Sequence, residues 1–184
     1  MARKIALLQL NPTVGDLAGN VGRIEALLAL AADAGALGAV ATELAISGYP
    51  PRDLLAKPAF LRQNQEALES LTKRSGKAVA VVGYASAHET DSGRPAQNSA
   101  AVLQDGQVAA VRHKTLLPNY DVFDEDRYFE PATGNTPVEI LGTKVGITIC
   151  EDIWNDEVFL HDRRYDRRPA EELAADGAEL LPNL

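Results

Sequence analysis

Three side chains of complementary chemistry, Glu43, Lys114 and Cys150, each lie at or just beyond the end of an apolar stretch of the sequence. A cysteine attacks a substrate as its thiolate, a carboxylate can take the thiol proton, and a nearby ammonium favours the thiolate. Each residue also has a structural interpretation: Cys150 as a small buried side chain, Glu43 as the cap of a strand, and Lys114 as a solvated charge. Spacing in the sequence leaves both interpretations open.

Motifs of several other enzyme classes are missing from the sequence. There is no Gly-x-Ser-x-Gly turn, no phosphate-binding loop ending in Gly-Lys-Ser or Gly-Lys-Thr, and no Gly-x-Gly-x-x-Gly. No His or Cys cluster has the spacing of metal ligands, so we expect no metal site. We interpret the scattered His88, His113 and His161 as solvated surface side chains.

The elements that must position the three candidate residues alternate in the first half of the chain. Apolar runs predict buried strands over 5–10, 39–44 and 78–84. Helical spacing predicts a helix that follows Asn20 and a second helix over 59–74. Glu43 is therefore expected at the end of the second strand, where a sheet presents side chains to a common cleft.

Hairpins replace this alternation in the second half. Residues 99–103 and 108–111 flank an Asp-Gly pair, a strong hairpin signal, and Lys114 follows the second strand. A further pair over 138–141 and 145–149 leads to Cys150. A short helix from Pro169 to Gly177 and a strand over 178–181 close the pattern. We predict an α/β fold with a mixed sheet.

Composition limits the partners of the chain. The 184 residues, 46% apolar and 24% charged, fit one soluble domain, and the net charge of −8 disfavours nucleic acid and anionic lipid. One cysteine cannot form an internal disulfide. The apolar run at 5–10 is too short for a signal peptide, and no run approaches the ~20 apolar residues of a membrane span. We expect a cytoplasmic protein without a membrane partner.

Longer motifs surround the candidate residues. They are Asn11 to Leu17 with Gly19-Asn20, Glu43-Leu44, Ser47 to Pro51, Asp53 to Leu55, His113 to Pro131, and Gly146 to Trp154. In this order, and over almost the whole chain, they resemble the nitrilase-like glutaminase domain of glutamine-dependent NAD synthetase. The resemblance implies an αββα sandwich with mixed sheets.

The resemblance also implies roles for the three residues and a fourth. Glu43 would be the general base, Lys114 the electrostatic stabiliser, Cys150 the nucleophile, and Glu125 the second glutamate, which orients the lysine. The family releases ammonia from glutamine through a cysteine thioester. A separate synthetase domain, which is where ATP and Mg are expected, then uses the ammonia to amidate deamido-NAD, and no cofactor is expected for the glutaminase reaction.

Two further residues are implied at the substrate site. Tyr120 matches the tyrosine that contacts glutamine, although a loop anchor is the alternative for an aromatic side chain there. Glu151 is expected at the substrate through its backbone N–H, which would stabilise the oxyanion together with Lys114.

The chain also departs from the family pattern. We expect residues 1–184 to be a single partial carbon-nitrogen hydrolase domain, truncated at its C-terminus before a serine-bearing substrate loop and further strands, with the synthetase domain absent. We further expect a homo-oligomer, because an unpaired sheet edge favours association. Two alternatives stay open: another amidase of the nitrilase superfamily, and an inactive fragment or binding module.

Overall fold

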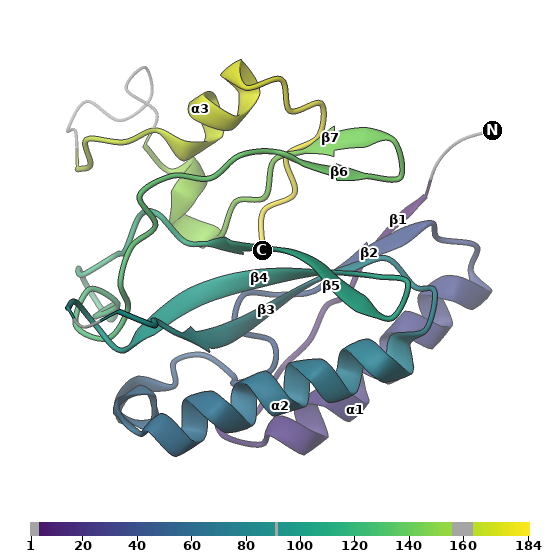
Figure 1. The fold of residues 1–184 in the computed structure, drawn as a ribbon, viewed down its shortest axis with the longest axis horizontal. Helices are drawn as coiled ribbons and strands as arrows, with labels where there is room; N and C mark the ends of the chain where they lie inside the picture. The colour runs from purple at the N-terminus through teal and green to yellow at the C-terminus, as the bar shows by residue number, and fades with distance from the viewer. Residues whose placement is uncertain (1–3, 91, 156–163) are drawn as a thin grey trace.

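Five strands form the central mixed sheet of the computed structural model, which describes residues 4–90, 92–155 and 164–184 (Figure 1). The strands are β1 (Ile5–Leu7), β2 (Gly38–Val40), β3 (Ala80–Ala87), β4 (Ala96–Gln104) and β5 (Gln107–His113), in that spatial order. The pairs β1–β2 and β2–β3 are parallel, and the pairs β3–β4 and β4–β5 are antiparallel. The predicted mixed sheet is confirmed.

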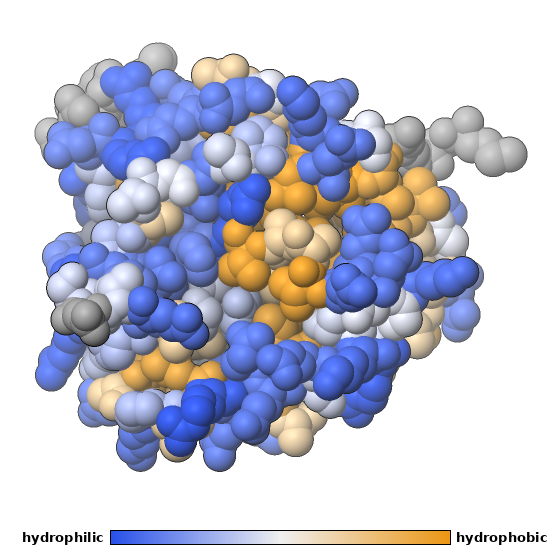
Figure 2. Space-filling view, viewed as in Figure 1, coloured by the Kyte–Doolittle hydropathy of each residue, from blue (hydrophilic) through white to orange (hydrophobic). Residues whose placement is uncertain are grey.

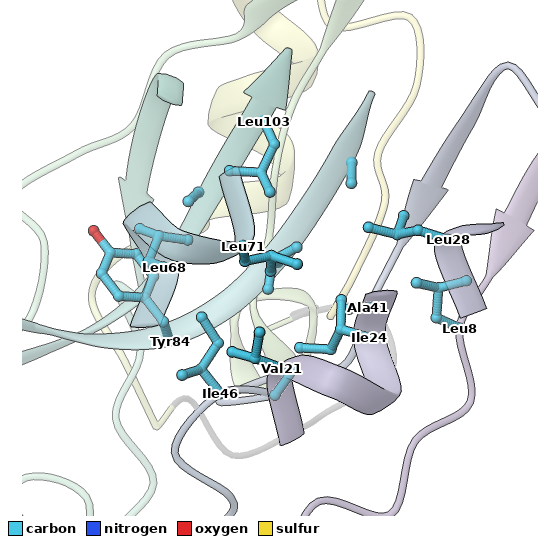
Figure 3. Packing of buried hydrophobic residues seen from close by; sticks show 14 of the residues in the cluster. Leu8, Val21, Ile24, Leu28, Ala41, Ile46, Leu68, Leu71, Tyr84 and Leu103 are labelled. Carbon is cyan, nitrogen blue, oxygen red and sulfur yellow. The ribbon is translucent and has the colours of Figure 1, made fainter. Parts of the chain in front are cut away.

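Two helices, α1 (Leu17–Asp33) and α2 (Pro58–Ser75), cover one face of this sheet (Figure 1). Asp16 caps α1 by accepting the N–H of Gly19 at 3.0 Å, and Pro58 starts α2, where its missing N–H costs nothing. The apolar faces of both helices bury side chains against the strands (Figure 3). That layer includes Val21, Ile24, Leu28, Leu68, Leu71, Tyr84 and Leu103.

A second, smaller layer lies on the opposite face of the sheet. It contains the hairpin of β6 (Val138–Ile140) and β7 (Thr143–Val145), and α3 (Pro169–Ala175) lies on its outer side (Figure 1). Figure 2 shows apolar side chains gathered between this hairpin and the central sheet, while hydrophilic side chains dominate the surface of the helical layer below. The layers thus follow the order helix, sheet, sheet, helix. Among the residues described, none of the helices has both the length and the apolarity that crossing a bilayer requires.

Some predicted boundaries were wrong for local reasons. The strand predicted over 39–44 ends at Val40, because the chain turns at Glu43 and Leu44 has a φ of +48°. The first helix begins at Leu17 rather than after Asn20. Asn20 is instead a residue of the first turn of α1, and its buried side-chain amide donates to the carbonyls of Thr13 and Ile46 at 2.8 and 2.9 Å.

The last predicted strand is replaced by isolated pairing. Leu180 pairs with Val145 and Asn183 with Thr148, both in parallel, so the final residues run beside the segment that leads to Cys150. Of the histidines, His113 is only partly exposed, and its Nδ1 lies 2.7 Å from the hydroxyl of the buried Ser99, so the surface interpretation was wrong there. His161 lies outside the described residues.

Gly83 lets the Glu43 turn lie directly against β3. A Cβ atom at this position would come within 2.4 Å of the Thr42 carbonyl oxygen and 2.5 Å of the Leu44 nitrogen. The backbone N–H of Ile46 donates to the Gly83 carbonyl at 3.2 Å and holds the turn there. The absence of a side chain at Gly83 is therefore a condition for the position of Glu43.

Gly83→Ala should lower the free energy of unfolding by about 1–3 kcal/mol, because backbone on both sides of the new methyl group must shift. The matched control is Gly22→Ala in α1, where a Cβ meets nothing within 4 Å and helix propensity should add about 0.5–1 kcal/mol. Urea unfolding measures both. Equal effects of the two substitutions would contradict the close packing at Gly83.

Candidate active site

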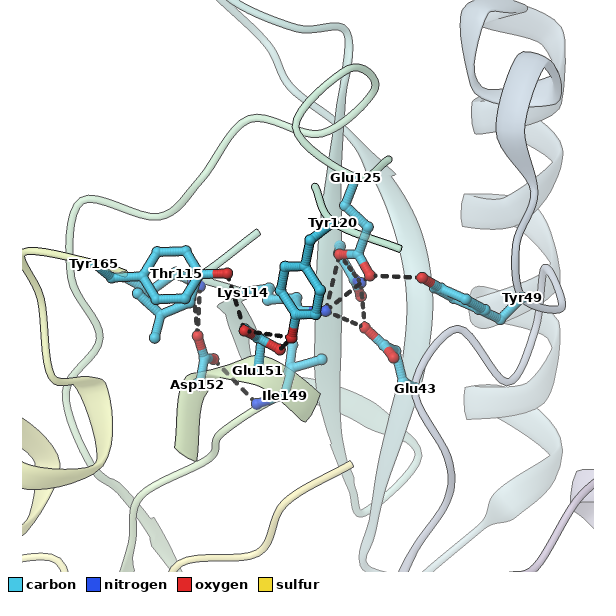
Figure 4. Close-up of polar contacts among 12 residues, drawn as sticks. Glu43, Tyr49, Lys114, Thr115, Tyr120, Glu125, Ile149, Glu151, Asp152 and Tyr165 are labelled. Carbon is cyan, nitrogen blue, oxygen red and sulfur yellow. Dashed lines mark hydrogen bonds and ion pairs between the residues drawn. The ribbon is translucent and has the colours of Figure 1, made fainter. Parts of the chain in front are cut away.

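A buried ammonium is at the centre of the site. Lys114 follows β5 directly, continues its ladder by donating its N–H to the Asn98 carbonyl at 2.8 Å, and is only 1% exposed. Its Nζ lies 2.7 Å from Glu43 Oε1 and 2.9 and 2.8 Å from the two carboxylate oxygens of Glu125 (Figure 4). The structure therefore joins three of the predicted residues in one ion cluster.

The charges of this cluster do not cancel. Burial lowers the pKa of Lys114, but Glu43 and then Glu125 outweigh burial and hold that pKa above its usual value. Burial also raises the pKa of Glu125, against the effect of Lys114. One ammonium thus faces two carboxylates, so with both carboxylates ionised the cluster has a net charge of −1.

Cys150 begins the short 3₁₀ helix η2 (Cys150–Ile153) in a left-handed conformation with a φ of +45°. A non-glycine residue rarely takes this conformation, and such strained turns gather at functional sites. The N–H of Cys150 donates to the Leu184 carbonyl at 2.9 Å, which holds the turn. The sequence predicted Cys150 directly after a strand over 145–149, whereas β7 ends at Val145, and it gave no sign of this backbone conformation.

The thiol of Cys150 is neutral in this site. Burial first and the charge of Glu43 second raise the pKa of Cys150 to about 12, although Lys114 acts in the opposite direction. Lys114 does not lower the pKa of the thiol enough to favour a resting thiolate, because burial and the two carboxylates outweigh its effect. A nucleophilic Cys150 consequently needs a base that takes its proton during attack.

Asp152 braces the turn beneath the nucleophile. Its carboxylate accepts the N–H groups of Thr115 and Leu116, both at 2.9 Å, and of Ile149 at 3.1 Å (Figure 4). Thr115 and Leu116 follow Lys114 in the chain, and Ile149 precedes Cys150, so Asp152 links the backbone beside both residues.

Burial raises the pKa of Asp152 to about 6, while the three N–H donors oppose a larger rise. Sequence reasoning missed this role, although Asp152 lies inside the Gly146 to Trp154 motif.

The wall of the site beside Cys150 is polar and consists of Glu151, Tyr120, Tyr165 and Arg164. Glu151 is 4% exposed and accepts the hydroxyl of Tyr120 at 2.9 Å and that of Tyr165 at 3.0 Å. The guanidinium of Arg164 lies 4.1 Å above the centre of the Tyr120 ring. Tyr120 and Glu151, each predicted at the substrate site, are thus in direct contact through their side chains. Tyr165 had no signal in the sequence because no motif includes it.

A third tyrosine, Tyr49, contacts Glu125. The Tyr49 hydroxyl donates to Glu125 Oε1 at 3.0 Å, and burial raises the pKa of Tyr49, followed by the charge of Glu125. Tyr49 belongs to the Ser47 to Pro51 motif, but its spacing gave no indication of this contact. The acceptor that orients Lys114 is therefore itself held in place.

Residues 4–183 match the family model of carbon-nitrogen hydrolases. The chain belongs to the carbon-nitrogen hydrolase family. It is 41% identical over 184 residues to the glutamine-dependent NAD(+) synthetase of Synechocystis sp., a match that covers 98% of this chain and 33% of that protein. The corresponding enzyme of Thermotoga maritima is 44% identical over 155 residues, which cover 83% of this chain and 26% of the relative. The resemblance predicted from the motifs is confirmed.

Solved structures agree with this assignment. The glutamine-dependent NAD+ synthetase of Acinetobacter baumannii superposes with a TM-score of 0.85 at 32% identity, over 99% of this chain and 32% of that one. An amidase from Nesterenkonia sp. has a TM-score of 0.76 at 20% identity, over 98% of this chain and 64% of that one, and shares the fold. The predicted nitrilase-superfamily fold is confirmed, and this carbon-nitrogen hydrolase chain spans about a third of the length of the synthetases it matches.

Asp152→Asn should lower the free energy of unfolding by about 1–3 kcal/mol, because an amide cannot accept all three N–H groups and leaves a buried donor unpaired. Asp33→Asn, at an exposed position near the end of α1, is the matched control and should stay within about 0.5 kcal/mol of the wild type. Urea denaturation measures both. A loss no larger than that of the control would refute the bracing role.

Glu43→Gln should lower the pKa of Cys150, because the substitution removes a negative charge that raises it. Cys150 is the only cysteine, so the pH dependence of its alkylation by iodoacetamide reports this single group. We expect the thiolate of the wild type to form only at strongly alkaline pH and that of Glu43→Gln to form at lower pH. An unchanged or raised midpoint would show that the two side chains are not coupled.

Proposed function

We propose that this chain is the glutaminase part of a glutamine-dependent NAD+ synthetase and hydrolyses the side-chain amide of glutamine. The observation that carries the proposal is the cluster of Glu43, Lys114 and Glu125 beside the strained turn of Cys150. The cluster provides a carboxylate base and an oriented ammonium next to a thiol, the groups that acyl transfer through a thioester requires. Membership of the carbon-nitrogen hydrolase family supports this chemistry.

The wall beside Cys150 suits an amino acid substrate. Glu151 is a buried carboxylate whose hydrogen bonds from described residues come from two neutral hydroxyls, those of Tyr120 and Tyr165. An ionised carboxylate that is buried without a cationic partner is unfavourable, so a cationic group of a ligand would stabilise it. In the proposal Glu151 receives the α-ammonium of glutamine, and Tyr120 contacts the substrate at the rim, where its side chain is 36% exposed.

The first half of the reaction uses Glu43 as the general base. Glu43 takes the proton of the Cys150 thiol while Sγ attacks the carboxamide carbon of glutamine. The raised pKa of Cys150 makes this transfer necessary, because the thiol holds its proton until the substrate arrives. The protonated Glu43 then gives the proton to the leaving nitrogen, ammonia departs, and the acyl group stays on Sγ as a thioester.

The oxyanion formed during attack is stabilised by two donors in the proposal, the ammonium of Lys114 and the N–H of Glu151. That N–H donates to no residue that the structure describes, so it is available. Lys114 can turn one N–H from Glu125 Oε1 to the oxyanion, because the Tyr49 hydroxyl still donates to that oxygen. Donors of this kind contribute about 3–4 kcal/mol in a transition state.

The second half of the reaction hydrolyses the thioester. Glu43 takes a proton from water, the resulting hydroxide adds to the acyl carbon, and the collapsing intermediate expels the thiolate, which recovers its proton from Glu43. Glutamine and water thus yield glutamate and ammonia. In the proposal the ammonia serves a synthetase domain, in keeping with the name glutamine-dependent NAD(+) synthetase of the relatives. The resemblance of the motifs implies that this domain uses ATP and Mg to amidate deamido-NAD.

Purified protein should convert glutamine to glutamate and ammonia in equal amounts, and a glutamine-like diazoketone should attach one label to Cys150. Cys150→Ala should abolish both. Glu43→Gln should lower kcat at least about 100-fold, because a general base contributes roughly 10²–10⁴ in rate. With a synthetase domain supplied, Cys150→Ala should block NAD+ formation from glutamine but not from ammonium salts.

The competing functions predict different results in the same assays. Faster turnover of simple aliphatic amides than of glutamine would identify an amidase of another type. Binding of glutamine without release of ammonia would identify a binding module. A diazoketone label on a residue other than Cys150 would overturn the assignment of the nucleophile.

A further inference from the structure

Asn98 contacts the charge cluster but has no part in the mechanism described above. It lies in β4, is 1% exposed, and pairs in register with Ala85 of β3. Its Nδ2 lies 2.7 Å from Glu43 Oε1 and 3.5 Å from Glu125 Oε2. The same two carboxylates hold Lys114, so Asn98 is a second donor to both of them.

The amide of Asn98 can face the cluster in one orientation only. Its NH₂ group must point to the carboxylates, because the carbonyl oxygen in that place would be repelled by two negative groups. The Oδ1 atom on the other side is buried and has no hydrogen-bond partner among the described residues. An unpaired buried acceptor destabilises the folded state, so an apolar side chain would fill this space at a lower cost in stability. The contact of Asn98 with the carboxylates is the feature that an apolar side chain could not provide.

The contact makes the two oxygens of Glu43 unequal. Oε1 accepts Asn98 Nδ2 and Lys114 Nζ, both at 2.7 Å. Oε2 accepts no hydrogen bond from the residues that the structure describes. Glu125 has the alternative arrangement, in which both carboxylate oxygens accept from the Nζ of Lys114. Without Asn98, rotation of the Glu43 carboxylate would allow the same two-oxygen contact and would occupy Oε2.

We propose that Asn98 is a positioning residue that fixes the Glu43 carboxylate so that Oε2 is the oxygen that receives the Cys150 proton. This inference rests on the glutaminase function proposed above. Asn98 holds Oε1 without adding a positive charge, whereas a second cation there would pair with Glu43 and weaken it as a base. Lys114 alone would not select an oxygen, because an ammonium is a point charge that either oxygen can contact.

The test compares Asn98→Ala with Asn64→Ala. Asn64 in α2 is also buried and also has an unpaired Oδ1. Its amide donates to the Phe60 carbonyl at 3.1 Å and makes no hydrogen bond to the cluster. With glutamine as substrate, Asn98→Ala should lower kcat about 100-fold, as expected for a misplaced catalytic group, and change KM less than about threefold. Asn64→Ala should leave both constants within about twofold of the wild type.

A double variant that combines Asn98→Ala with Glu43→Gln shows whether Asn98 acts through Glu43. Asn98→Ala should change the residual rate of Glu43→Gln less than about threefold, because the group that it positions is already lost. Losses that multiply in the double variant would overturn the proposal, and so would wild-type kcat in Asn98→Ala. Asn98→Leu keeps a similar shape and removes the donor without adding charge, so it should lose kcat as well if Asn98→Ala folds poorly. Absence of glutamine hydrolysis by the wild type would instead refute the proposed function.

Discussion

Burial of an ammonium requires negative charge within hydrogen-bonding distance, because an unpaired charge away from water is far less stable than the same charge in solvent. Lys114 meets this requirement with Glu43 and Glu125, which reach it from two separate connecting segments. With both carboxylates ionised, the negative charge exceeds this requirement by one, and burial together with the charge of Glu43 raises the pKa of the neighbouring thiol. A base and its proton donor are thus kept together until a substrate is bound.

Other features of the fold serve to keep these charged groups at fixed distances. Gly83 admits the Glu43 turn against β3, and Asp152 joins the backbone after Lys114 to the backbone before Cys150. Tyr49 supports Glu125 from outside the cluster. Gly83 and Tyr49 add no charge to the site, and three backbone N–H groups stabilise the added carboxylate of Asp152.

Local patterns in the sequence predicted much of this architecture. Asp105 and Gly106 both have positive φ, as a tight hairpin turn requires, and the apolar periods located both long helices. The family motifs brought Glu43, Lys114, Glu125 and Cys150 together as a hypothesis, and the structure places the first three in contact. Asn98, Tyr165 and the left-handed turn at Cys150 could not be predicted, because they depend on which distant segments become neighbours. The raised pKa of Cys150 could not be predicted for a related reason: it depends on burial and on how many carboxylates surround the lysine.

The β4–β5 hairpin has a consequence for how the site is assembled during folding. It brings Asn98 beside Lys114 through a two-residue turn, and the contact from Lys114 to Glu125 spans only 11 residues, whereas that to Glu43 spans 71. Closing a short loop costs less chain entropy, and a hairpin forms in about 1–10 μs. Local closure therefore favours an order in which the lysine has a counterion before the long-range contact with the base is made. A folding chain that follows this order never has to desolvate a lone ammonium.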